Sequence, residues 1–198
     1  MVEERKRLAV LMLQKTGVFP GSDSKCLEVG CGSLGWLGDL IDWGVKETSI
    51  HGIELNPIRA QHAGELLPMA DIQVGDAAQL PWHDSTFHLV IASTVFTSIL
   101  DQNVRRIVAE EISRVLAPGG ALLWYDFRVN NPKNPHVKKV SRDELRKLFP
   151  QLRGDIQSVT LAPPLTRFLV PRSLTLATAL SSVPVLRTHL LAVLAKPL

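Results

Sequence analysis

The sequence predicts an α/β fold, in which helices cover both faces of a doubly wound parallel sheet. Short apolar runs that fit buried strands alternate along the chain with segments of helical period. A glycine-rich turn follows the first of these strands and opens the next helix. With 198 residues, of which 45% are hydrophobic and 21% charged, the chain has the size and composition of a single globular domain, residues 1–198.

Residues 1–17 predict an amphipathic helix that ends at Gly17. The segment has no small-residue cleavage site after a long apolar run, so it differs from a signal peptide. The chain contains no run of about 18 apolar residues, which a membrane-spanning helix needs. We therefore expect a cytoplasmic protein without a transmembrane segment.

Seven segments have the length and the apolar character of strands, and most are bounded by turn residues. The expected strands are residues 25–29, 49–55, 71–74, 87–92, 121–127, 156–161 and 188–195. Cys26 and Cys31 lie at the first strand, and their odd spacing places them on opposite faces of it. We expect two buried free thiols and no disulfide.

The helices are recognised from the residues at their ends. Gly44 ends a helix over residues 34–43, and Pro57 stands at the first position of a helix over 57–67. A helix is expected over residues 102–116, which Pro118-Gly119-Gly120 ends, with Ile107, Ile112, Val115 and Leu116 on its buried side. Another is expected over residues 141–149, with Ser141 as N-cap and Glu144 at the capping-box position. The last is expected over residues 166–181.

The segment CLEVGCGSLGWLGDL, residues 26–40, predicts a ligand site. Gly30, Gly32 and Gly35 fit the G-x-G-x-x-G pattern, which lets the backbone turn tightly and approach a ligand closely. The following helix would point its unpaired N–H groups into the same space. The pattern indicates a nucleotide-like ligand, although glycine turns also join strands to helices where nothing binds.

Acidic residues at the strand ends narrow the choice of nucleotide. Glu54 follows Gly35 by 19 residues, a spacing that a dinucleotide dehydrogenase would also show. Glu28 stands two residues before the first glycine, where a dehydrogenase usually has an apolar residue, and Asp76 ends the third strand. These two acids favour a different nucleotide cofactor.

With these residues the chain resembles the class I S-adenosylmethionine-dependent methyltransferases, particularly the small-molecule, type 11-like enzymes. LEVGCGSLG resembles their first motif, GIELN their second acidic position, and GDAAQLPWHDSTFHLVIAS their third and fourth motifs. RVLAPGGALLWYDF resembles the helix, turn and strand that follow. The resemblance implies a Rossmann-like sheet of seven strands, mostly parallel, with an antiparallel last strand.

The resemblance also implies roles for individual residues. Gly30, Gly32 and Glu28 would face the methionine part of S-adenosyl-L-methionine, Glu54 would bind the ribose hydroxyls, and Asp76 would meet the adenine amino group. The implied cofactor-binding residues are Glu28, Gly30, Cys31, Gly32, Glu54, Leu55, Asp76, Ala77 and Ser93. One departure is His88, where the family usually has Asp after Phe, a position that serves the strand and not the cofactor.

Methyl transfer from a sulfonium is a direct displacement, so the protein mainly aligns the two reactants and excludes water. A small-molecule acceptor is expected, with oxygen as the acceptor atom and nitrogen or carbon as alternatives. A base is needed only if the acceptor must lose a proton, and Tyr125, Asp126 and His136 are weak candidates for catalysis. The histidines show no metal-ligand spacing, so no metal site is expected.

Residues 162–187 predict an insertion on the substrate side, because the segment is apolar with scattered arginines. It would form a lid or the surface of a homodimer and would favour an apolar or anionic substrate. From Pro132 to Arg172 the chain carries a net charge of about +6, but without the interleaved aromatic residues of a nucleic-acid-binding surface. No sequence-specific nucleic-acid binding is expected.

Two other functions stay open. The chain could keep the cofactor pocket without turnover and act as a partner subunit, since intact acids do not exclude that role. It could also be a dehydrogenase, which binding of NAD in place of S-adenosylmethionine would reveal.

Overall fold

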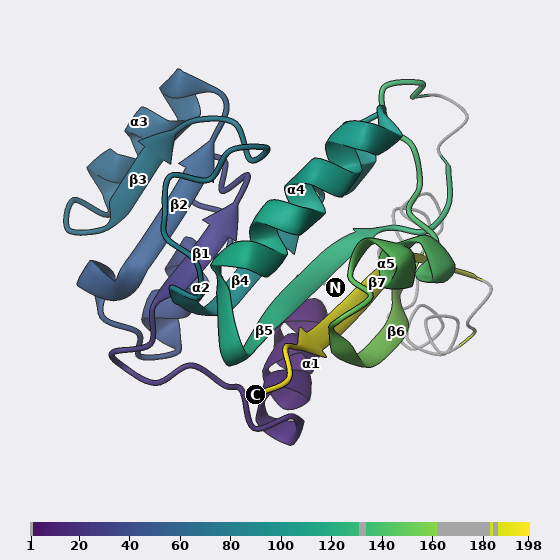
Figure 1. Ribbon diagram of the computed structural model, residues 1–198, viewed down its shortest axis with the longest axis horizontal. Coiled ribbons are helices and arrows are strands. Elements are labelled where there is room, and N and C mark those ends of the chain that lie inside the picture. The colour runs from purple at the N-terminus through teal and green to yellow at the C-terminus, as the bar shows by residue number, and fades with distance from the viewer. Residues whose placement is uncertain (1, 131–133, 162–182, 184–185) are drawn as a thin grey trace, which may run out of the picture.

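A computed structural model of the protein describes residues 2–130, 134–161, 183 and 186–198. Its centre is a seven-stranded sheet with the order β3-β2-β1-β4-β5-β7-β6 (Figure 1). The strands are β1 (Cys26–Val29), β2 (Ile50–Glu54), β3 (Asp71–Val74), β4 (Phe87–Ser93), β5 (Leu116–Phe127), β6 (Arg153–Leu161) and β7 (Arg187–Ala195). The first five strands pair in parallel, whereas β7 is antiparallel to both β5 and β6. The predicted fold, including the antiparallel last strand, is confirmed.

Helices cover both faces of the sheet, as the doubly wound fold requires. The helices are α1 (Val2–Lys15), α2 (Leu37–Asp42), α3 (Pro57–Leu66), α4 (Gln102–Val115) and α5 (Arg142–Leu148), with short 3-10 turns η1 (Glu47–Ser49) and η2 (Phe96–Ser98). One apolar core joins α1, α2 and α3 to the sheet, and the other joins α4 and α5 to the opposite face. Figure 1 shows α4 crossing the sheet close to β4 and β5.

The strand order brings the carboxyl ends of β1, β2, β3 and β4 to one edge of the sheet. The order reverses at β1, which pairs with β2 on one side and β4 on the other. In parallel sheets the crevice outside the strand ends at such a reversal is the usual place for a ligand. The glycine-rich turn after β1 lies at this point.

The structure corrects three sequence-based expectations. The segment Pro118-Gly119-Gly120 does not precede β5 but lies inside it, because the strand pairs from Leu116 onward and a register shift absorbs the extra residues. Helix α2 begins three residues later than expected. Ile107 is 38% exposed, and the buried face of α4 carries Arg105 instead. The helix expected over residues 166–181 lies outside the described residues.

Arg105 is fully buried and ties α4 to the chain that follows β5. Its guanidinium pairs with the Glu144 carboxylate at 2.6 Å and donates to the backbone carbonyl oxygens of Ile99 and Lys138 at 2.7 and 2.8 Å. Ser141 caps α5 as expected, since its Oγ accepts from the Glu144 N–H at 3.1 Å. The Glu144 side chain binds Arg105, which explains how a buried cation is tolerated at this position.

Both cysteines are buried free thiols, as the sequence predicts. Burial raises the pKa of each thiol to about 12, so both stay protonated near neutral pH. Among the described residues, no helix has the length and apolar character to cross a membrane.

Candidate functional site

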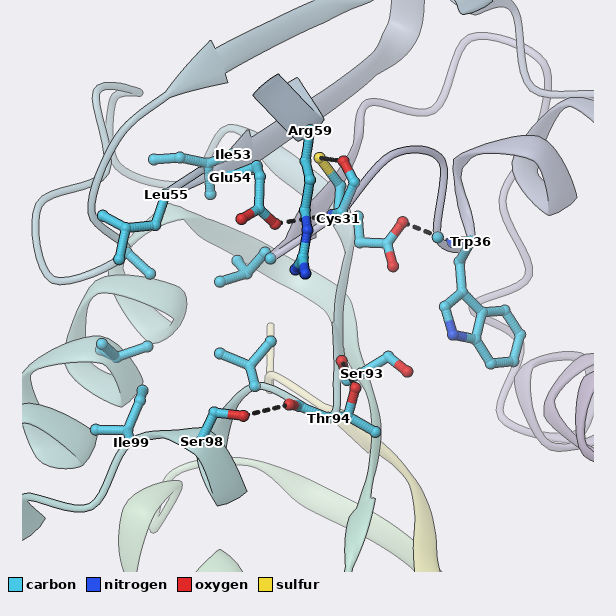
Figure 2. A pocket seen from close by; sticks show the side chains of 18 of the residues that line it. Cys31, Trp36, Ile53, Glu54, Leu55, Arg59, Ser93, Thr94, Ser98 and Ile99 are labelled. Carbon is cyan, nitrogen blue, oxygen red and sulfur yellow. Dashed lines mark hydrogen bonds between the residues drawn. The ribbon is translucent and has the colours of Figure 1, made fainter. Parts of the chain in front are cut away.

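A cavity of about 710 Å³ opens at the carboxyl ends of β1, β2 and β4 (Figure 2). All nine residues that the sequence assigns to the cofactor line this cavity, namely Glu28, Gly30, Cys31, Gly32, Glu54, Leu55, Asp76, Ala77 and Ser93. They come from four strands or strand ends that are separated in sequence. The sheet topology therefore brings the predicted residues together around one space.

The glycine turn after β1 has a backbone that only glycine adopts easily. Gly30 has a φ of +67°, and a Cβ at this position would lie 2.8 Å from Cγ2 of Val95. Gly32 has a φ of +60°, and a Cβ there would meet no protein atom within 4 Å. The first glycine is thus required by the protein's own packing, whereas the second leaves open space in front of its backbone for a ligand.

Glu28 connects β1 to the start of α2. Its side chain is 1% exposed, and Oε2 accepts a 2.7 Å hydrogen bond from the backbone N–H of Trp36. Burial raises the pKa of this carboxyl well above its usual range, and the backbone donors of Trp36 and Leu37 oppose that rise. Glu28 lines the cavity and also satisfies an N–H group at the beginning of the helix.

Glu54, at the end of β2, is held by two backbone donors. Oε2 accepts from the Gly32 N–H at 2.9 Å, and Oε1 accepts from the Asn56 N–H at 3.0 Å. The side chain is 8% exposed. Each carboxylate oxygen has room for a second hydrogen bond, so the fixed pair of oxygens suits a vicinal diol such as that of a ribose.

Asp76 and an apolar wall form the other end of the cavity. Asp76 Oδ1 accepts from the Ala78 N–H at 2.9 Å, and the side chain is exposed. Beside it the cavity is lined by Ala77, Val95, Ile99, Val104 and Val108. A flat aromatic ring with an exocyclic amino group fits this combination of apolar surface and one carboxylate.

The chain after β4 has a strained backbone at the cavity. Thr94 has a φ of +58°, which is unusual for a β-branched residue, and its N–H donates to the Tyr125 carbonyl at 2.7 Å. Its own carbonyl accepts from Ser98 Oγ at 3.3 Å, as the dashed line in Figure 2 marks. These bonds hold Ser93 and Thr94 at the cavity wall.

The three weak candidates for catalysis do not line the cavity. Tyr125 is buried, and its hydroxyl lies 3.0 Å from Thr160 Oγ1. Asp126 accepts from the Oγ1 and the N–H of Thr97 at 2.6 and 3.1 Å, and so fixes η2 after β4. His136 is exposed. In the described structure, Tyr125 and Asp126 act as supports of the segments around the cavity.

Several residues that line the cavity were not predicted from the sequence, and three of them carry large side chains with N–H donors. Arg5 of α1 lines the cavity. Trp36 stands at the start of α2, and Arg59 extends from α3 toward Glu54 (Figure 2). Arg5 and Arg59 each lie in a helix where a charged residue is expected to face solvent, so the sequence holds no signal for their position. Among the described residues, no group of three or more His, Cys, Asp or Glu side chains could hold a metal ion.

Comparison with known proteins places the site in a family context. Residues 26–120 match a family described as "Methyltransferase domain". The chain is 33% identical over 114 residues to the sterol 4-C-methyltransferase strm-1 of Caenorhabditis elegans, covering 54% of this chain and 32% of that protein. It is 36% identical over 112 residues to phthiotriol/phenolphthiotriol dimycocerosates methyltransferase 1 of Mycobacterium ulcerans, covering 56% and 40%. The chain thus spans less than half the length of either relative.

Solved structures share the whole fold at low sequence identity. A S-adenosylmethionine-dependent methyltransferase of Archaeoglobus fulgidus aligns with a TM-score of 0.66 at 14% identity, covering 96% of this chain and 94% of that one. A chain from the complex between the Haloferax volcanii Trm112 methyltransferase activator and a methyltransferase aligns with a TM-score of 0.68 at 20% identity, covering 99% and 95%. These similarities show that the sheet and its helices have the arrangement of this fold.

Proposed function

We propose that the chain, whose residues 26–120 match the methyltransferase domain family, is a class I S-adenosylmethionine-dependent methyltransferase and that it transfers a methyl group to a small-molecule acceptor. The observation that carries the proposal is the meeting of Glu28, Glu54 and Asp76 around one cavity with the glycine turn. S-adenosyl-L-methionine, the cofactor of this family, supplies an activated methyl group on a sulfonium. The protein has to bind and orient this cofactor.

We propose that each acid binds one part of the cofactor. Glu54, fixed by Gly32 and Asn56, accepts from the two ribose hydroxyls, and Asp76 uses its second oxygen for the adenine amino group. Ala77 and Leu55 cover the adenosine part, while Gly30, Cys31 and Gly32 approach the methionine part. Ser93 borders the place of methyl transfer.

We propose an acceptor with an apolar body and an acidic oxygen nucleophile. The titratable side chains that line the described cavity are carboxylates, one protonated thiol and arginines, and none of them is a histidine or a lysine. An acceptor that loses its proton to water needs no base from the enzyme. The apolar body is suggested by the names of the relatives that act on sterols and dimycocerosates. Carbon and nitrogen acceptors are the alternatives.

Residues 162–187 are proposed as a substrate-side insertion of a single domain that runs from residue 1 to 198. Its apolar composition suits a lid over an apolar acceptor or the surface of a homodimer. The N-terminal helix, residues 1–17, would add Arg5 to the same cavity.

A second function is a cofactor-binding partner subunit without turnover. One similar chain comes from a complex with a methyltransferase activator, so this fold is known to work with a partner protein. In such a subunit the cofactor would bind as tightly as in an enzyme, and no acceptor would be methylated.

The proposal is tested with methyl-labelled S-adenosylmethionine and a panel of sterols, long-chain carboxylic acids, phenols and amines. Formation of S-adenosylhomocysteine together with a labelled product would support an enzyme, and mass spectrometry of the product would identify the acceptor atom. Tight cofactor binding without any labelled product, in the presence or absence of cell extract, would favour the partner subunit.

A further inference from the structure

Two buried hydrogen-bond donors at one end of the cavity have no acceptor among the residues that the structure describes. They are Nε of Arg5 and Nε1 of Trp36, and both residues line the cavity. Trp36 is only 2% exposed, and its ring stands at the opposite side of the cavity from Leu55 in Figure 2. The third donor of this kind, Nε1 of Trp124, belongs to a residue of the apolar core and not to the cavity lining.

Arg5 is held in place by two aromatic rings. Its guanidinium carbon lies 4.4 Å from the centre of the Tyr125 ring and 4.8 Å from that of Trp36. Within the described part of the chain the guanidinium has no hydrogen bond or ion pair. Stacking on aromatic faces fixes the plane of the guanidinium but leaves its in-plane N–H donors unsatisfied. A buried donor without an acceptor costs about 1–3 kcal/mol, so its presence in a cavity calls for a ligand that accepts from it.

Glu28 stands next to these donors. The backbone N–H of Trp36 donates to the Glu28 carboxylate, while the indole N–H of the same residue has no partner. The end of the cavity therefore offers the carboxyl oxygens of Glu28 as acceptors, together with two side chains that only donate. An α-amino acid group, with an ammonium and a carboxylate on the same carbon, is complementary to this set.

We infer that Arg5 and Trp36 form a subsite for a carboxylate in the ligand of the main cavity. The inference rests on the proposed function, because the amino-acid end of S-adenosylmethionine is the first source of that carboxylate. Glu28 would then receive the ammonium of the same group. An acid group on the acceptor is a second source of the same chemistry, and the experiment separates the two.

The test compares two adenosine thioethers by calorimetry. S-adenosylhomocysteine carries the amino-acid group, whereas 5′-methylthioadenosine has the same adenosine and sulfur without it. The variants are Arg5→Met and Trp36→Phe, with Arg7→Met as the control because Arg7 is exposed on the same helix. Thermal unfolding of each variant checks that the fold is intact.

If the carboxylate belongs to the cofactor, Arg5→Met lowers the affinity for S-adenosylhomocysteine about 10- to 100-fold, which is the effect expected from the loss of a hydrogen bond to a charged group. Trp36→Phe weakens it less, and 5′-methylthioadenosine binds all three variants within about twofold of the wild type. If the carboxylate belongs to the acceptor, S-adenosylhomocysteine binds normally to Arg5→Met. Octanoate then binds to the wild-type protein saturated with S-adenosylhomocysteine but not to saturated Arg5→Met.

Nuclear magnetic resonance gives a direct readout of the second donor. The four tryptophans give four indole N–H signals, and the one that is absent from Trp36→Phe belongs to Trp36. This signal should move downfield with the carboxylate-bearing ligand and stay in place with 5′-methylthioadenosine.

Two results would overturn the inference while leaving the proposed function standing. One is an equal loss of affinity for both thioethers in Arg5→Met, which would mean that Arg5 only supports the cavity wall. The other is unchanged binding of both thioethers with no octanoate binding to the saturated wild type. If the wild type binds neither thioether, the proposed function itself fails and the subsite loses its basis.

Discussion

Glu54 Oε2 accepts a 2.9 Å hydrogen bond from the backbone N–H of Gly32 and so joins the end of β2 to the glycine turn after β1. The two elements are 22 residues apart in sequence and meet because β1 and β2 pair in parallel. The bond orients the carboxylate toward the cavity. Glu54 is therefore part of the proposed ribose site, and it also fixes the turn that we propose binds the methionine part of the cofactor.

Replacing Glu54 with Gln should lower the affinity for S-adenosylhomocysteine about 10- to 100-fold, as measured by calorimetric titration. An amide has one acceptor oxygen and one donor nitrogen, so either Gly32 or Asn56 loses its acceptor and the diol loses half of its site. Glu65→Gln, an exposed acid on α3, is the control and should bind as the wild type does. Equal affinities of Glu54→Gln and wild type would remove Glu54 from the ribose site.

Gly30→Ala should destabilise the protein by about 2 kcal/mol, measured by urea unfolding. The added Cβ would meet Val95 at 2.8 Å, and the positive φ is unfavourable for alanine. Gly64→Ala is the matched control. Gly64 lies inside α3 with open space around it, so alanine there should add about 0.5–1 kcal/mol of stability.

The double variant Gly30→Ala/Val95→Ala separates the two causes. It should recover the part of the lost stability that comes from the contact with Val95. The part that comes from the positive φ of the backbone should remain lost. A fully stable Gly30→Ala protein would show that the turn can take another conformation.

Arg105→Met should lower the free energy of unfolding by about 3 kcal/mol or more. The change leaves the Glu144 carboxylate and the carbonyl oxygens of Ile99 and Lys138 without their buried donor. The neighbouring residue offers a control, because Arg106 is exposed and pairs only with Glu110 on the same helix. Arg106→Met should change the stability by less than about 1 kcal/mol. Similar losses for the two variants would contradict the role given to Arg105.

His189 should make the protein less stable in weak acid. Burial, aided by the charge of Arg5, lowers the pKa of His189 from 6.5 to about 4 in the folded protein. The unfolded chain then binds more protons than the folded one between pH 6.5 and pH 4, so stability falls as the pH falls through this range. The loss attributable to His189 is about 3 kcal/mol at pH 4.

His189→Phe keeps a ring that can stack on Tyr125 and removes the titration. The difference between its free energy of unfolding and that of the wild type should grow as the pH is lowered from 6.5 to 4. His83→Gln changes an exposed histidine and should keep the wild-type pH dependence. A constant difference between His189→Phe and wild type across this range would show that His189 is not the group responsible.

The sequence predicts which acids meet at the cavity because these residues obey a rule of parallel sheets. Glu28, Glu54 and Asp76 stand at or just beyond the carboxyl ends of three strands, and such ends meet at one edge of the sheet. The strands could be recognised from short segments bounded by turn residues, so the meeting of the three acids followed from the identity of the strands alone. The meeting of these three acids could therefore be predicted without any information about side-chain packing.

Other residues could not be placed from the sequence, because long-range packing decides their surroundings. Hydrophobicity predicts that Ile107 is buried, but it is 38% exposed and Arg105 is buried on the same helix. The helical period puts Arg105 on the inner face, and Glu144, 39 residues later, makes its burial tolerable. Arg5 lies in a run of charged residues, and only the packing of α1 near β7 brings it to Tyr125. The start of β5 was misplaced because the glycines after Pro118 indicate a turn, whereas the structure uses them in a bulge.

The most direct test of the account is a calorimetric titration of the wild-type protein with S-adenosylmethionine and, separately, with NAD. A cavity that joins Glu28, Glu54, Asp76 and the glycine turn is predicted to bind S-adenosylmethionine at one site per chain and to give no heat with NAD. Saturable binding of NAD, with none of S-adenosylmethionine, would contradict the account and assign the cavity to a dinucleotide.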